Sequence, residues 1–81
     1  MRLEYSARLL ESLAEAPTSV QKAFYKQVRL LEQNIRHPSL KAKKYNESKD
    51  IWQARVTLSW RFYFRISGDM YYLLDVIKHP K

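Results

Sequence analysis

The stretch WRFYFRI, residues 60–66, alternates two kinds of side chain without a break. The apolar residues Trp60, Phe62, Phe64 and Ile66 take one parity, and Arg61, Tyr63 and Arg65 take the other. Successive side chains of a strand point to opposite faces, so this stretch predicts a strand with one apolar and one cationic face.

The alternation reaches back to residue 51 and covers sixteen residues. At about 3.3 Å per residue, one strand of that length would reach roughly 53 Å. A globule of 81 residues has a radius of gyration of only about 12 Å, so the run must fold back. Opposite residues of an antiparallel pair share a face, which places the turn at residues 57–59. The predicted pairs are Val56 with Trp60, Ala54 with Phe62 and Trp52 with Phe64.

A third strand follows the only glycine of the chain, Gly68, because SGD at residues 67–69 is typical of a hairpin turn. A turn centred on Gly68 pairs Phe64 with Tyr72, Phe62 with Leu74 and Trp60 with Val76. In this register Asp75 lies opposite Arg61. The three segments predict an antiparallel β-meander.

The N-terminal half shows a different period. Residues 2–5 alternate and predict a short edge strand, and Ser6 predicts the N-cap of a first helix that ends before Pro17. The apolar stripe of this helix consists of Leu9, Leu10 and Leu13.

A second helix begins at TSVQ, residues 18–21, which resembles a capping box with Thr18 at the N-cap and Gln21 reaching back. Its apolar stripe recurs at spacings of three and four: Val20, Phe24, Val28, Leu31 and Ile35. The helix ends at His37, because Pro38 disfavours helical backbone in the preceding residue. We expect two antiparallel helices to cover the apolar face of the meander, which gives an α+β fold.

Length and composition limit the function classes. A chain of 81 residues is expected to form one domain, 1–81, which buries only about 60 % of the surface of its unfolded chain. It has no cysteine and two histidines, so disulfides and metal sites are not expected and a binding partner is the remaining stabiliser. No long apolar run or signal-peptide pattern is present, and we expect a cytoplasmic protein with no membrane partner and no cofactor.

The net charge of +7 is concentrated in residues 36–81, which hold ten basic and four acidic groups. Positive charge concentrated in this way favours a polyanionic partner such as nucleic acid or the ribosome. The alternative is a solvated lysine surface without a partner.

The cationic face brings two arginines together. Arg55 is expected opposite Arg61, and like charges in that position destabilise a sheet by about 0.2–1 kcal/mol. Two guanidinium groups match the oxygens of a phosphate, which predicts an anion site. In the alternative, Asp75 neutralises Arg61 and Arg55 is simply solvated.

Other groups on or beside this face suit RNA. Gln53 is expected opposite Tyr63, whose ring offers a base a stacking surface, and Arg65 shares their face. His79 shares it too, four residues beyond Asp75, and histidine titrates near neutrality and can act as acid or base. The lysines Lys41, Lys43 and Lys44 are expected to precede the sheet, rim this face and hold the RNA backbone.

The residue types limit the chemistry. The sequence has no nucleophile elbow, no glycine-rich phosphate loop and no cluster of metal ligands. RNA cleavage suits such a chain, because the 2′-hydroxyl of the substrate is the nucleophile. The protein then needs only to orient that hydroxyl, stabilise charge on phosphorus and protonate the leaving oxygen.

Three segments, HPSLKAKKY, IWQARVTLSWRFYFRI and YYLLDVIKHPK, resemble the RelE/ParE superfamily of toxins from toxin–antitoxin systems. The resemblance spans nearly the whole chain and implies a RelE-like domain, a short strand and helical hairpin packed on an antiparallel β-meander. Its most specific parts are HPSLKAKK and the Trp60-Arg61 pair that opens a strand.

The resemblance also implies roles for individual residues. RelE-like members cleave mRNA on the ribosome without metal, and Arg61 matches the arginine that contacts the scissile phosphate. Arg55 matches a strand lysine, and His79 lies near a late basic residue. Two features depart from the RelE pattern: Gln53 replaces a further lysine, and the segment that carries a stacking tyrosine is missing after Lys81.

We therefore predict the toxin of a type II toxin–antitoxin system, a ribosome-dependent, metal-independent mRNA endoribonuclease that inhibits translation. Arg61, Arg55 and His79 are the predicted catalytic residues, and the partners are a cognate antitoxin, the ribosome and mRNA. One alternative is a ParE-like inhibitor of DNA gyrase. The other is a module that binds RNA or a protein partner without catalysis.

Overall fold

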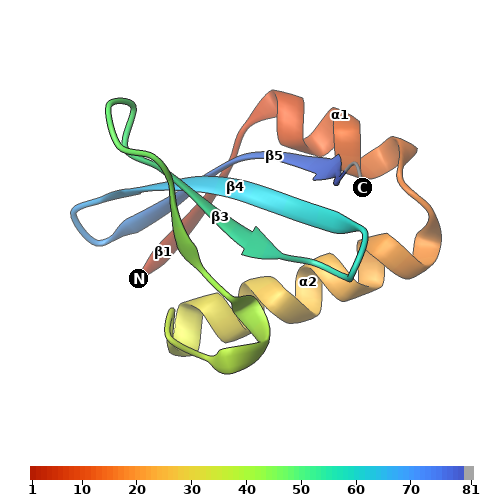
Figure 1. Ribbon diagram of the computed structural model, residues 1–81. Coiled ribbons are helices and arrows are strands. Elements are labelled where there is room, and N and C mark those ends of the chain that lie inside the picture. The colour runs from red at the N-terminus through yellow and green to blue at the C-terminus, as the bar shows by residue number, and fades with distance from the viewer. Residues whose placement is uncertain (80–81) are drawn as a thin grey trace.

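The computed structural model describes residues 1–79 of the chain. Strands and helices follow in this order: β1 (Arg2–Tyr5), α1 (Ala7–Glu15), α2 (Thr18–Gln33), the 3₁₀ helix η1 (Pro38–Leu40), β2 (Lys43–Asn46), β3 (Ile51–Arg55), β4 (Trp60–Ser67) and β5 (Met70–Lys78). Figure 1 shows α1 and α2 antiparallel, as predicted, and the strands gathered into one sheet. Within residues 1–79, no helix is long and apolar enough to cross a membrane.

The sheet has five strands in the order β1-β5-β4-β3-β2. The pairs from β2 to β5 are antiparallel, whereas β1 pairs with β5 in parallel. The predicted meander and the predicted edge strand at residues 2–5 are thus confirmed, and the fold is α+β. The predicted position of the lysines before the sheet is wrong for two of them, because Lys43 and Lys44 lie within it, on the edge strand β2.

The two helices begin with different N-cap residues, only one of which was predicted correctly. Ser6 caps α1 as predicted, because its Oγ accepts a hydrogen bond of 3.0 Å from the backbone N–H of Leu9. The predicted capping box of α2 is wrong: Pro17 occupies the N-cap, and no side chain caps the helix. Gln21 instead donates its side-chain N–H to the carbonyl of Ala16 at 3.0 Å.

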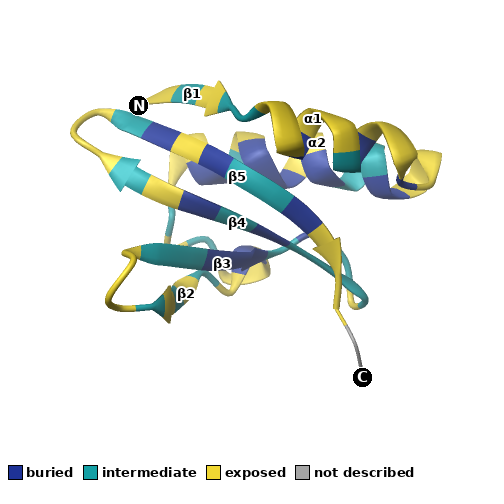
Figure 2. Cartoon of the chain, turned by 90° about the horizontal axis from the view of Figure 1, so that it is seen from above, coloured by how far each residue is buried: buried dark blue, intermediate teal, exposed yellow. Residues whose placement is uncertain are grey.

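The core confirms the predicted apolar stripes of the two helices with two exceptions, whereas on β5 Tyr71 and Leu73 are buried in place of the predicted Tyr72 and Leu74. Leu9 and Leu13 of α1 are buried, but Leu10 is half-exposed on the outer side of the helix. Ile35 lies beyond the end of α2 and is only partly buried against the core. The centre is aromatic: Phe24 meets Phe62 edge-on with ring centroids 5.6 Å apart. Figure 2 shows the resulting change of burial from residue to residue along β5 and β4.

The β3–β4 register agrees with the prediction: Trp52 pairs with Phe64, Ala54 with Phe62 and Arg55 with Arg61. The β4–β5 register does not agree. Ser67 pairs with Met70, so the turn is a two-residue loop in which Gly68 adopts the left-handed φ of +58°.

A bulge shifts the β4–β5 register once more. Phe64 pairs with Leu73 but Tyr63 pairs with Asp75, so Leu74 has no partner. The predicted pairing of Asp75 with Arg61 is therefore wrong, and Ile77 lies opposite Arg61 instead. Asp75 forms an ion pair with Arg8 of α1 at 3.1 Å. The carboxylate of Asp75 is therefore paired with a helix residue and does not neutralise Arg61.

Candidate anion-binding site

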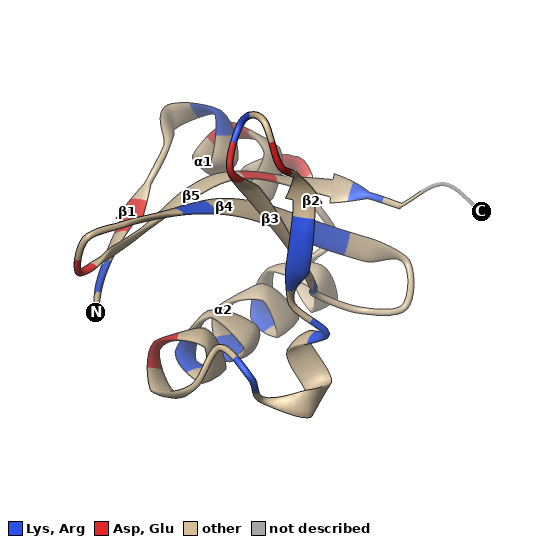
Figure 3. Ribbon diagram, turned by 60° about the vertical axis from the view of Figure 1, so that its left-hand side comes forward, with Lys and Arg blue, Asp and Glu red and all other residues tan. Residues whose placement is uncertain are grey.

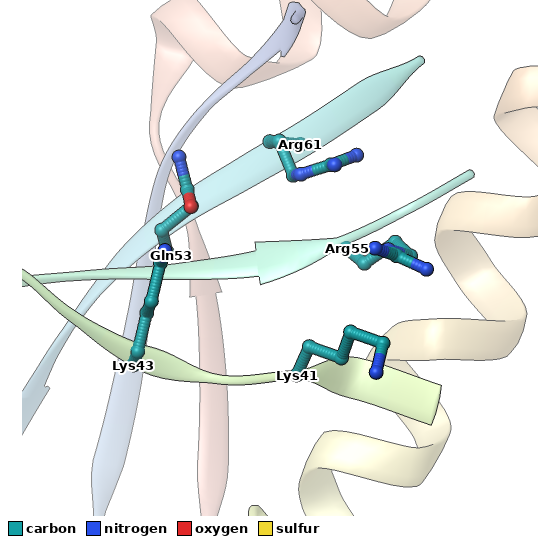
Figure 4. Close-up of a pocket in the computed structure, with 5 residues that line it drawn as sticks. All are labelled: Lys41, Lys43, Gln53, Arg55 and Arg61. Atoms are coloured by element: carbon teal, nitrogen blue, oxygen red, sulfur yellow. The ribbon is translucent and has the colours of Figure 1, made fainter. Parts of the chain in front are cut away.

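A small pocket of about 130 Å³ opens on the cationic side of the sheet. Five residues line it: Lys41, Lys43, Gln53, Arg55 and Arg61. They come from the segment after η1 and from β2, β3 and β4, and Figure 3 shows basic positions side by side on β2 and its neighbour. In Figure 4 the charged ends of Arg61, Arg55 and Lys41 lie one below the other along the pocket. Among the described residues, the lining contains four cationic side chains and no carboxylate.

The turn between β3 and β4 holds Arg61 in place. Its Nη1 donates hydrogen bonds to three backbone carbonyls, those of Thr57 at 2.7 Å, Leu58 at 3.2 Å and Trp60 at 3.0 Å. Backbone dipoles rather than a carboxylate therefore fix the guanidinium group, and its positive charge is not neutralised. Burial of the guanidinium, and then the charge of Arg55, lower the pKa of Arg61.

Arg55 has an unsatisfied polar atom. Its Nε is fully buried and has no hydrogen-bond partner among residues 1–79. An unsatisfied buried donor costs about 1–3 kcal/mol, and more when the group is charged. Arg55 also lies directly opposite Arg61 in the ladder. Two like charges side by side, one of them with an unpaired donor, are an arrangement that a bound anion would stabilise.

A buried glutamine, which the sequence pattern did not lead us to predict, connects two segments that carry pocket residues. Gln27 of α2 is 6 % exposed. Its Nε2 donates hydrogen bonds to the backbone carbonyls of Arg55 at 2.9 Å and Ser39 at 3.2 Å. It therefore joins the end of β3 to the segment that leads into Lys41. The available signal was its position in the helix, three residues after Phe24 and four before Leu31, which places an amide on the apolar stripe.

The three lysines predicted to bind the RNA backbone do not lie together in the structure. Lys41 and Lys43 line the pocket. Lys44 is placed otherwise than expected, because it pairs with Trp52 and therefore has the opposite parity from Lys43, which pairs with Gln53. Its ammonium group forms an ion pair with Asp50, which raises the pKa of Lys44, and lies 5.2 Å from the centroid of the Trp52 ring.

Gln53 and Tyr63 meet as the register predicted. Gln53 is buried, and its Nε2 donates a hydrogen bond of 3.1 Å to the hydroxyl oxygen of Tyr63. Tyr45 of β2, which the sequence analysis did not single out, packs its ring against the ring of Tyr63. Arg65 has the same parity but lies farther along β4, where its Nε donates to the carbonyl of Lys49 at 3.2 Å. It does not line the pocket.

His79 lies closer to Arg61 than predicted. Ile77 is opposite Arg61, and His79 follows two residues later with the same parity. Its backbone N–H donates to the carbonyl of Ser59 at 2.6 Å, which extends the ladder past the end of β5. The side chain is exposed and does not line the pocket. Its role in proton transfer stays a prediction.

No protein-family model and no curated protein matches the chain. Solved structures match closely in three dimensions. A YoeB/ParE toxin from Agrobacterium tumefaciens gives a TM-score of 0.81 at 15 % identity, with 99 % of this chain and 100 % of that chain covered. The archaeal RelE–RelB complex from Pyrococcus horikoshii OT3 gives 0.81 at 14 % identity, with coverages of 99 % and 96 %.

A third structure, the toxin–antitoxin complex RelBE2 from Mycobacterium tuberculosis, gives a TM-score of 0.78 at 16 % identity, with 98 % of this chain and 96 % of that chain covered. The chain therefore has the RelE-like fold, from β1 to β5. This confirms the fold that the resemblance to the RelE/ParE superfamily implied.

Proposed function

We propose that this chain is the toxin of a type II toxin–antitoxin system and cleaves mRNA on the ribosome without a metal ion. One observation carries the proposal: Arg55 and Arg61 line one pocket with two lysines, and among residues 1–79 no carboxylate lines that pocket. The pocket is positive, small and part of a fold that solved toxins share. A phosphodiester group satisfies both guanidinium groups at once.

The reaction follows from the charges. The 2′-oxygen of the substrate attacks the adjacent phosphorus, its O–P bond forms, and the bond from phosphorus to the 5′-oxygen breaks. Arg61 and Arg55 stabilise the negative charge that builds up on the phosphoryl oxygens. The 2′-hydroxyl loses a proton and the leaving 5′-oxygen gains one, and His79 is the candidate for either transfer.

The remaining contacts hold the RNA. Lys41 and Lys43 bind backbone phosphates in or beside the pocket, which makes the affinity fall with salt. Gln53 supplies a polar wall, and Arg65 extends the cationic face along β4. Lys44 is not part of this set, because Asp50 already neutralises it.

The proposed partner in the resting cell is an antitoxin. Two of the similar structures are complexes of this kind, RelE with RelB and the complex RelBE2. An acidic, partly apolar segment would complement the net charge of +7 and cover exposed apolar side chains such as Leu10 and Tyr25. The free toxin acts in the cytoplasm, where its proposed target is the translating ribosome.

In vitro translation with mapping of mRNA ends tests the proposal. Wild-type protein should produce discrete cuts in translated mRNA, and Arg61→Ala should lose at least two orders of magnitude of cleavage, as removal of one charge-stabilising group does. Arg29→Ala is the matched control: it removes an exposed arginine of α2 that does not line the pocket, and cleavage should persist.

Two results would overturn the proposal. Intact mRNA together with inhibited DNA supercoiling by gyrase would assign the chain to the ParE-like activity. Intact mRNA without any effect on gyrase, with RNA or antitoxin still bound, would make it a binding module without catalysis.

A further inference from the structure

An exposed tyrosine, Tyr45, lies beside the pocket. Tyr45 is 60 % exposed, the largest exposed fraction among the aromatic side chains of residues 1–79. It lies at a bulge of β2: Lys44 pairs with Trp52 and Asn46 pairs with Ile51, so Tyr45 itself has no partner in the ladder. A bulge turns a side chain in a direction that a regular strand does not allow.

The bulge directs the ring of Tyr45 onto Tyr63. The two ring centroids are 5.0 Å apart with an angle of 67° between the planes, an edge-to-face contact. Tyr63 is itself fixed, because the buried Gln53 donates a hydrogen bond to its hydroxyl oxygen at 3.1 Å. One side of the Tyr45 ring is therefore supported by the protein, and the rest is open to solvent.

The Tyr45 ring lies near the cationic pocket, and this position indicates what kind of ligand it would contact. Gln53 and Lys43, the neighbours of this aromatic pair in the ladder, both line the pocket. Arg55 lies two residues beyond Gln53 on β3, a step of about 7 Å along the same face. No cation covers Tyr45, since the only cation placed over a ring among residues 1–79 is Lys44, which lies over Trp52.

We propose that Tyr45, supported by Tyr63 and Gln53, is a stacking platform for the nucleobase next to the phosphate held by Arg55 and Arg61. The inference rests on the proposed function and adds a base-binding position to it. Aromatic rings beside a cationic groove bind single-stranded RNA in this way, because every base offers a flat face. Tyr45 then contributes affinity for bases of any sequence, and the arginines contribute affinity for the backbone.

The test compares RNA with and without bases. We would measure fluorescence anisotropy with a labelled short oligoadenylate and with an abasic oligomer of the same length and charge. Both carry 2′-O-methyl groups, which remove the nucleophile and keep the RNA intact. Wild-type protein should bind the oligoadenylate more tightly than the abasic oligomer.

The variants separate the ring from the charge. Tyr45→Ala should weaken oligoadenylate binding by about fivefold or more, the loss typical of one stacked base, and should leave abasic binding unchanged. Tyr45→Phe should keep wild-type binding, because the ring and not the hydroxyl does the work. Tyr25→Ala, which removes an exposed tyrosine of α2, is the matched control and should have no effect.

The binding results distinguish a failure of the stacking platform from a failure of the phosphate pocket. If Tyr45→Ala weakens both oligomers equally, or neither, the platform is wrong. If Arg55→Ala leaves abasic binding unchanged, the phosphate pocket of the proposed function is wrong, while the base effect of Tyr45 can still be read. A wild-type protein that binds neither oligomer would overturn the platform, whereas the translation assay decides the proposed function, which requires the ribosome.

Discussion

The two faces of the β3–β4 hairpin follow opposite rules. On one face, Phe62 and Phe64 are completely buried, and Phe24 of α2 packs edge-on against Phe62. On the other face, Arg55 and Arg61 lie side by side, and Arg55 keeps a buried donor without a partner. The side chains of the apolar face are buried against other residues of the same chain. The cationic face keeps two like charges together, and under the proposed function a bound phosphate balances them.

The largest effect is expected on the apolar face. Phe62→Ala should reduce the free energy of unfolding by about 3–5 kcal/mol, because it removes a buried ring from the aromatic centre and leaves a cavity. A small domain has only about 5–15 kcal/mol in total. Urea unfolding followed by circular dichroism measures the loss. A change below 1 kcal/mol would mean that the centre of the core lies elsewhere.

Gln27 links α2 to the end of β3 through hydrogen bonds. Its replacement should have the next largest effect on the free energy of unfolding. Gln27→Met keeps the size of the side chain but leaves the carbonyls of Arg55 and Ser39 without their donor. We expect a loss of about 1–3 kcal/mol in the free energy of unfolding, together with weaker RNA binding. Gln33→Met, at an exposed position in the last turn of α2, is the control and should leave both quantities unchanged.

On the cationic face the sign should reverse. Arg55→Met removes the unpartnered donor and the repulsion from Arg61, and repulsion of this kind is worth about 0.2–1 kcal/mol. The free energy of unfolding should therefore stay constant or rise while mRNA cleavage is lost. Thermal unfolding and the translation assay measure the two quantities on the same sample. A marked loss of stability would show that Arg55 serves the fold rather than a ligand.

The smallest effect separates two neighbouring lysines. Lys43→Gln should reduce the slope of log K against log salt for single-stranded RNA by about 0.7, the value for one lost phosphate contact. Lys44→Gln should leave the slope unchanged, because Asp50 already pairs with this lysine. Binding titrations at several salt concentrations give both slopes. Equal slopes for the two variants would remove Lys43 from the proposed RNA contacts.

Local rules predicted well what local patterns control. The N-cap at Ser6 follows from residue type at a helix start, and the β3–β4 register follows from matching apolar parities over a short turn. The prediction of a capping box at Thr18 failed because Pro17, one residue earlier, occupies the N-cap and Thr18 is already the first helical residue. Parity alone also did not reveal the bulge at Leu74. The extra residue shifts the buried parity from Tyr71 and Leu73 to Val76, but the run YYLL is apolar in both parities and hides the shift.

The candidate site was predictable only in part for the same reason. The pairing of Arg55 with Arg61 depends on one hairpin, and the sequence specified it. The separation of Lys43 from Lys44 depends on the parity of an edge strand that the sequence barely marks. Gln27 and Tyr45 contribute through α2 and through a bulge, and no pattern within their own segments connects them to the arginines.

The sequence by itself determined the alternation that makes one sheet face apolar and the other cationic, because the period of a strand is written in neighbouring residues. Only the tertiary structure decided which charges remain unpaired. Asp75 went to Arg8 of α1 instead of Arg61, and the Nε of Arg55 became buried without a partner. Such pairings depend on how distant segments pack against one another, and the geometry of that packing belongs to the folded chain as a whole.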